Sequence, residues 1–189
     1  MLNKIDFDSK KPQDREKILR FLQYAGFTVP PHGMAKDIYQ QGDALGAFDC
    51  VVYFDNIKPQ KMSLAQANKI CPQNFSVLYL GDATLSSSTV TTKMVQIGNR
   101  SFWFDFKSED NWRSNQGKWK SKLQMVSPGY HKVIKIPLFS IDFIKTNTTY
   151  AIDFDLIPAC GKTSLVKVIS RKEASTLIKQ AYRDLEFLT

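Results

Sequence analysis

Two apolar, strand-like segments that each carry acidic residues place the tightest constraint on what this 189-residue chain can fold into. They lie in residues 138–160, LFSIDFIKTNTTYAIDFDLIPAC, and the polar turn KTN between them predicts a β-hairpin. Alternate side chains of a strand project from one face, so Asp153 and Asp155 share a face, and the hairpin sets Asp142 beside them. Three carboxylates in apolar strands repel one another and lose hydration, so they need a counter-charge.

Two kinds of counter-charge satisfy this requirement. A hard divalent cation such as Mg²⁺ takes oxygen ligands and also bridges phosphates, which makes Asp142, Asp153 and Asp155 candidate metal ligands. Alternatively, some of these acids lie at a solvated edge or pair with lysine side chains. The spacing alone favours neither solution.

The other segments complete an α+β pattern, with a central, mostly antiparallel sheet and flanking helices. Helices are predicted where apolar residues recur at helical spacing or a cap is present: residues 12–25, the segment SLAQANKI capped by Ser63, and the C-terminal segment that follows the Ser170–Glu173 capping box. Further strands are predicted at 48–54, 75–80, 93–97 and 101–106, the last two joined by the hairpin turn Gly98-Asn99. Residues 33–46 are expected to form a loop with one short turn of helix, and residues 108–132 a long loop with at most one short element. Residues 83–92 are a small, hydroxylated stretch.

The charge composition indicates which classes of molecule the chain is expected to bind. The net charge of +8 favours anionic partners, either an acidic protein surface or nucleic acid, although well-separated lysines also serve solubility. The densest lysine region covers residues 118–135, and three tryptophans near it offer stacking surfaces for bases. Aromatic residues of a hairpin more often belong to the core.

Targeting signals and redox chemistry point to the cytoplasm. The N-terminal residues are polar and no apolar run reaches the roughly 18–20 residues of a membrane span, so neither secretion nor a membrane partner is expected. Three widely spaced cysteines form no disulfide framework, and two histidines argue against a histidine-based zinc site. The GKTS run at 161–164 lacks the glycine of a phosphate-binding loop, because Leu156 stands at that position.

The acidic hairpin resembles the C-terminal core of ATP-grasp proteins, in which a strand ending in I-D-F is followed by a turn and a strand with two acids, or an acid and Asn, two residues apart. The resemblance implies ATP and Mg²⁺ as cofactors, with the metal on Asp142, Asp153 and Asp155. Upstream, Ile97-Gly98-Asn99-Arg100 and Trp112-Arg113-Ser114-Asn115 are similar to a hairpin and a W-R-(T/S)-N segment of the same family.

That upstream segment implies roles for two residues. In the family its Arg and Asn lie near the phosphates and the acceptor substrate, which assigns Arg113 and Asn115 as candidate catalytic residues, and Arg113 also as a nucleotide ligand. The resemblance covers residues 1–189 as one ATP-grasp-like domain, with a divergent part at 1–72 and a better-matching core at 73–189, and it leaves the oligomeric state open.

Two departures from the family leave the activity open. Tyr53 stands where a strand lysine normally holds phosphates, and residues 55–62 contain no glycine for a loop over them. Lys36, Lys58 and Lys93 are the candidates to replace that lysine, and Lys93 is assigned to the nucleotide. The chain is therefore expected to be an Mg-ATP-dependent carboxylate–amine ligase or its catalytic remnant, or else a noncatalytic, pseudoenzyme-like module whose basic surface binds a protein or nucleic acid.

Overall fold

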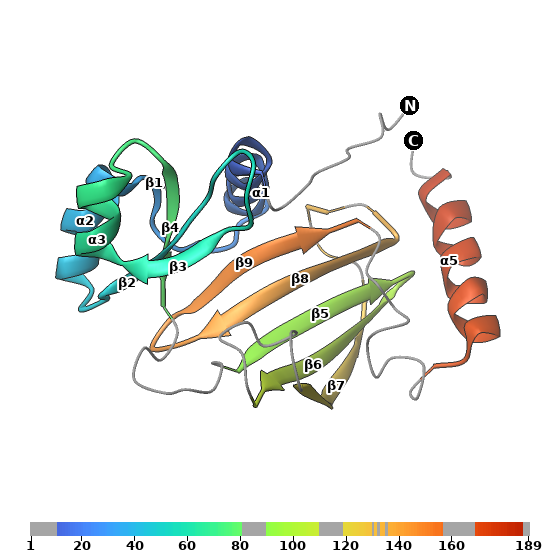
Figure 1. Ribbon diagram of the computed structural model, residues 1–189. Coiled ribbons are helices and arrows are strands. Elements are labelled where there is room, and N and C mark those ends of the chain that lie inside the picture. The colour runs from blue at the N-terminus through green and yellow to red at the C-terminus, as the bar shows by residue number, and fades with distance from the viewer. Residues whose placement is uncertain are drawn as a thin grey trace. The chain divides into compact units, whose positions relative to one another are not determined.

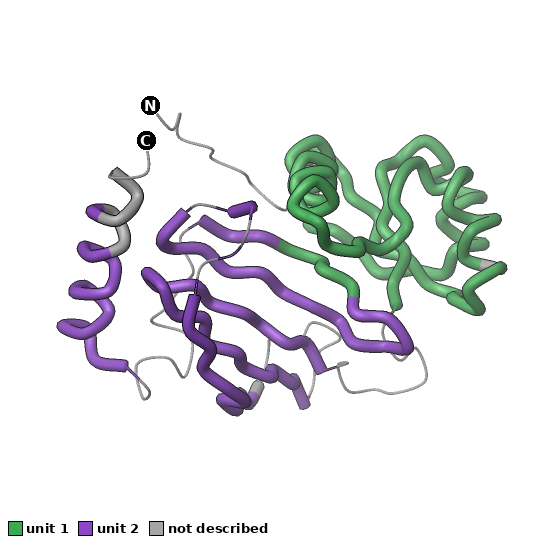
Figure 2. The backbone as a smooth tube through the Cα atoms, turned by 180° about the vertical axis from the view of Figure 1, so that it is seen from behind, with its two compact units in different colours: residues 1–84, 150–153 green, residues 85–149, 154–189 purple. Residues whose placement is uncertain are grey.

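Two antiparallel sheets and four helices form the part of the chain that the computed structural model describes (Figure 1). The described residues are 11–80, 90–109, 119–129, 131, 133–134, 136–156 and 169–186. The chain divides into two compact units, residues 1–84 with 150–153 and residues 85–149 with 154–189 (Figure 2). The predicted α+β class is thus confirmed. No helix of the described segments is long and apolar enough to cross a membrane.

The first unit begins with α1 (Pro12–Tyr24), which starts at a proline suited to the first helical turn. Its four short strands are β1 (His32–Met34), β2 (Asp49–Val52), β3 (Gln60–Ser63) and β4 (Phe75–Tyr79), and they pair antiparallel in the order β1-β4-β2-β3. The helices α2 (Ala35–Ala44) and α3 (Leu64–Ile70) cover one face of this sheet. The core beneath them consists of Ala35, Ile38, Cys50, Val52, Leu64, Ala67, Cys71 and Leu78.

The helix α2 corrects the expectation of a loop at 33–46. Its buried side chains, Ala35 and Ile38, are few, so the apolar periodicity is weak. Gly42 contributed to the expectation of a loop, but in the structure it is a buried helical residue that allows α3 to pack closely against α2. A Cβ at this position would come within 2.2 Å of Leu64 Cδ1. By contrast, α3 begins as predicted, with the Gln66 amide donating to Ser63 Oγ at 3.2 Å.

The second unit contains a five-stranded sheet in the order β7-β6-β5-β8-β9. Its strands are β5 (Thr91–Ile97), β6 (Arg100–Ser108), β7 (Trp119–Pro128), β8 (Leu138–Lys145) and β9 (Thr149–Asp155), although residues 150–153 of β9 belong to the first unit. The predicted hairpin at Gly98-Asn99 and the predicted strands on both sides of the KTN turn are confirmed. The helix α5 (Arg171–Glu186) starts at the predicted capping box, where the Glu173 amide donates to Ser170 Oγ at 3.1 Å.

The strand β7 corrects the second predicted loop, at 108–132. It pairs along the whole of β6, with a register shift between Trp103 and Phe104. Four of its ten residues are lysine or serine, and several of its side chains are exposed, as is usual for a strand at a sheet edge. Its sequence therefore does not show the apolar run that marks inner strands.

The β5–β6 turn lies directly against α5. Gly98 has φ +57°, in the left-handed region, and a Cβ at this position would lie 2.5 Å from the backbone oxygen of Leu177. Two constraints therefore select glycine here, the turn conformation and the approach of a helix backbone.

We expect Gly98→Ala to lower the free energy of unfolding by about 2–4 kcal/mol. About 1 kcal/mol arises from placing a Cβ at positive φ, and about 1–3 kcal/mol from overpacking against α5. Gly46→Ala is the matched control, because Gly46 has φ +62° with nothing within 4 Å of the added Cβ, so only the conformational cost applies. Urea unfolding measures both variants, and equal losses would contradict the packing argument.

Candidate functional site

Lys93 and Asp142, two of the predicted site residues, form an ion pair across the centre of the five-stranded sheet. They are directly opposite on β5 and β8, and Lys93 Nζ lies 2.7 Å from Asp142 Oδ1. Their side chains are only 15% and 13% exposed. The counter-charge that the sequence required at Asp142 is therefore a lysine in this structure, and the pair lies in a poorly hydrated place where electrostatic interactions are strong.

Asp153 has a different cation, Arg15 of α1, which sequence reasoning missed. Arg15 Nη1 lies 2.8 Å from Asp153 Oδ1, and the same guanidinium donates a hydrogen bond to the carbonyl oxygen of Ile152. The Arg15 side chain is 9% exposed and its Cζ lies 5.7 Å from the centre of the Tyr53 ring. The sequence does contain a sign that Arg15 is buried. It is spaced from the buried Ile18 and Leu22 so that all three lie on the apolar face of α1.

The other predicted site residues are either exposed or outside the part of the chain that the structure describes. Asp155 is exposed at the end of β9, two residues from Asp153. Arg113 and Asn115 lie outside the described residues. Within the described segments, no three His, Cys, Asp or Glu side chains gather closely enough to hold a metal ion. The metal site on Asp142, Asp153 and Asp155 stays a prediction.

A second half-buried lysine lies on the four-stranded sheet. Lys61 Nζ is 3.1 Å from Asp49 Oδ2 and 4.1 Å from the centre of the Tyr79 ring. Lys61 was not among the lysines predicted to replace the missing strand lysine, because the short strand β3 was not predicted. The polar residues 58–61 hide this strand from a search for apolar alternation.

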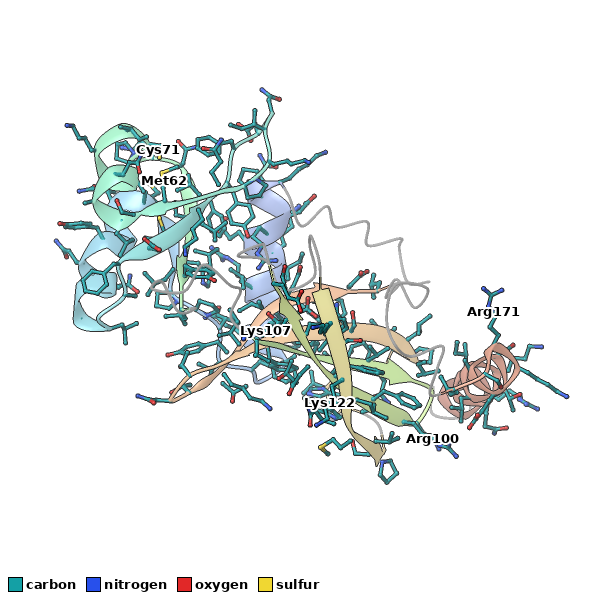
Figure 3. All side chains as sticks on the ribbon, turned by 60° about the horizontal axis from the view of Figure 1, so that its bottom comes forward. Met62, Cys71, Arg100, Lys107, Lys122 and Arg171 are labelled. Atoms are coloured by element: carbon teal, nitrogen blue, oxygen red, sulfur yellow. The ribbon has the colours of Figure 1, made fainter. Side chains whose placement is uncertain are left out.

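The predicted basic region is only partly described. Lys107 and Lys122 are exposed on β6 and β7 (Figure 3). Lys120 pairs with Glu109, and this hydrogen bond raises the pKa of the lysine. Asp105 of β6 accepts hydrogen bonds from Thr92 and Gln124, each at 2.7 Å. Positive charge is thus spread along the outer strands and is partly neutralised there.

Comparison with known proteins identifies the fold. No family model matches the sequence, and no curated protein is significantly similar to it. Among solved structures, a RiPP-associated ATP-grasp ligase from Chryseobacterium gregarium, in complex with ADP and a leader and core peptide, matches 89% of this chain with a TM-score of 0.54 and 12% identity. The ATP-grasp ligase PsnB complexed with minimal precursor matches 86% with a TM-score of 0.57 and 10% identity.

These likenesses confirm the ATP-grasp-like fold. PsnB with minimal precursor, Mg and ADP also matches 86% of the chain, with a TM-score of 0.53 and 13% identity. The chain spans 58% of the Chryseobacterium ligase and 59% of PsnB with minimal precursor. At these identities the similarity concerns the fold, and the activity has to be argued from the residues of the chain.

We expect Arg15→Met to lower the free energy of unfolding by about 2 kcal/mol or more, because it removes the cation of Asp153 and the donor to Ile152 together. Arg20→Met on the same helix is the matched control. Arg20 pairs with Glu16 at 2.6 Å, but the two side chains are 71% and 40% exposed, so the loss should stay below about 1 kcal/mol. Urea unfolding measures both variants. A similar loss of unfolding free energy in the two would show that the buried contacts of Arg15 do not stabilise the first unit more than an exposed ion pair does.

Proposed function

We propose that the chain binds Mg-ATP and is an ATP-grasp-like carboxylate–amine ligase or the catalytic remnant of one. The observation that carries this proposal is the half-buried Lys93–Asp142 pair in the central strands of an ATP-grasp-like fold. In such a reaction the γ-phosphoryl group moves to the carboxylate, ADP leaves, and an amine displaces phosphate from the acyl phosphate.

The Lys93–Asp142 pair suits Mg-ATP because each member finds a partner of the required charge. With Mg-ATP bound, the ammonium of Lys93 would pair with a phosphate oxygen instead of Asp142, and the Asp142 carboxylate would be an oxygen ligand for Mg²⁺. Neither group is left buried without a counter-charge, which limits the cost of the exchange. When bound, Mg²⁺ neutralises charge that develops on the phosphate oxygens.

Further ligands are proposed on β9 and at Arg113 and Asn115. Asp153 and Asp155 project from one face of β9, so both carboxylates are available to one site if Arg15 shares Asp153. Arg113 and Asn115 are proposed to face the phosphates and the acceptor. One similar ligase is complexed with a leader and core peptide and another with a minimal precursor, which supports a peptide as the substrate of this chain as well.

A noncatalytic binding module is the second candidate. Tyr53 occupies the position at which a phosphate-binding lysine is expected, and the cation beside it, Arg15, is already engaged by Asp153 and Ile152. In this alternative the fold binds a nucleotide or none, and the basic outer strands bind an acidic protein or nucleic acid.

Nucleotide titration tests the proposed site. We expect Lys93→Met to weaken Mg-ATP binding at least 10-fold in isothermal titration calorimetry, because a cation aimed at phosphate is lost. Asp142→Asn should remove most of the effect of Mg²⁺ on ATP affinity while affecting metal-free ATP less. Lys120→Met, which breaks an exposed ion pair of the same sheet, is the control and should bind like the wild type. Wild-type affinity in Lys93→Met and Asp142→Asn would reject this site.

Catalysis is tested separately by release of ADP. We expect the isolated chain to release ADP very slowly or undetectably even when nucleotide binds, because Tyr53 and the glycine-free residues 55–62 remove two phosphate contacts. Loss of one well-placed donor typically costs about 10²–10³-fold in rate. Rapid ADP release that disappears in Asp153→Asn would contradict this expectation and establish a ligase that uses other cations.

A further inference from the structure

Three sulfur-containing side chains gather on one face of the four-stranded sheet. Cys50 of β2 and Met62 of β3 are directly opposite one another, so their side chains project from the same face. Cys71, the residue that ends α3, approaches from above, with its Sγ 3.9 Å from Met62 Sδ (Figure 3). Three successive elements, β2, β3 and α3, thus bring two thiols and one thioether together.

The surroundings of these sulfurs are apolar. Cys50 and Cys71 belong to the buried cluster beneath α2 and α3, and Met62 packs against it. Cys50 is fully buried, whereas Cys71 is 8% exposed. Burial, with smaller contributions from Cys71 and Asp49, raises the pKa of the Cys50 thiol to about 12, and burial also raises the pKa of Cys71. Both thiols are therefore protonated at neutral pH.

A set of sulfur donors without hard ligands is selective for soft cations. Thiolate and thioether ligands suit Cu(I), whereas structural Zn²⁺ requires four ligands, almost always Cys or His. The described residues provide no third His, Cys, Asp or Glu beside the two thiols. Two sulfurs bound to one trigonal metal at about 2.3 Å lie roughly 4 Å apart, which the Met62–Cys71 distance of 3.9 Å already satisfies.

We propose that Cys50, Met62 and Cys71 form a binding site for one Cu(I) ion. As Cu(I) enters, the Cys71 thiol releases one proton to solvent, so a monovalent cation replaces a proton and the net charge of the buried cluster is unchanged. The thiolate of Cys71 and the thioether of Met62 bind the ion, and a lone pair of the Cys50 thiol completes a trigonal set. Cys71 is the point of entry, since it is the more exposed of the two thiols.

The proposal is tested on the full chain in a Cys160→Ser background, which removes the third cysteine of the sequence. Cu(I) is titrated anaerobically in competition with a chromogenic chelator. We expect one Cu(I) per chain and release of about one proton at pH 7. Met62→Leu, which preserves the core volume, should weaken binding at least 10-fold, and Cys71→Ala should abolish it. Cys50→Ala should weaken binding less than Cys71→Ala.

Met34→Leu is the matched control, because Met34 lies in the same unit with 45% exposure and should leave Cu(I) affinity unchanged. X-ray absorption should show only sulfur neighbours at about 2.3 Å. Unchanged affinity in Met62→Leu, nitrogen or oxygen ligands in the spectrum, or binding lost on Cys160→Ser alone would each overturn the proposal and leave the three residues as apolar core. If Cys71→Ala does not fold, as judged by circular dichroism, Met62→Leu and the spectrum decide.

Discussion

The first unit depends on the interactions of the buried Arg15 guanidinium. This group connects the helix α1 with two other parts of that unit, the ring of Tyr53 and residues 150–153, through one cation–π contact, one hydrogen bond and one ion pair. A backbone hydrogen bond from Ala151 to Thr28 at 2.8 Å supports the same attachment. An arginine suits this place because its planar, permanently charged group can serve several partners at once.

Asp142 and Asp153 show two ways of keeping a carboxylate in an apolar strand. Asp142 is neutralised by the residue opposite it on the next strand, and Asp153 by a helix at the other end of the sequence. In both pairs the basic side chain already contacts the carboxylate when no ligand is bound. Such preformed pairs reduce the reorganisation needed when charged ligands exchange with them, and they also make each acid depend on one specific basic residue.

Sequence reasoning succeeded where local chemistry decides the structure. The Ser63 and Ser170 caps, the Gly98-Asn99 turn and the acidic hairpin each depend on residues close in sequence, and the structure confirms them. It failed at α2 and β7, whose formation depends on tertiary contacts: Gly42 is explained by the close approach of Leu64, Ala47 and Leu78, and β7 by its pairing with β6. For the candidate site, the pattern identified the acids but not their partners, because Arg15 and Asp153 are 138 positions apart.

The attachment of residues 150–153 to the first unit has a consequence for the order in which the protein is made. The unit's other residues have all been synthesised at Thr84, yet the segment that carries Asp153 follows some 65 residues later. At about 5–20 residues per second, the 138 positions between Arg15 and Asp153 take about 7–28 seconds to synthesise. The first unit is therefore completed only after residues 85–149 of the second unit have been made, and its ion pair cannot form before then.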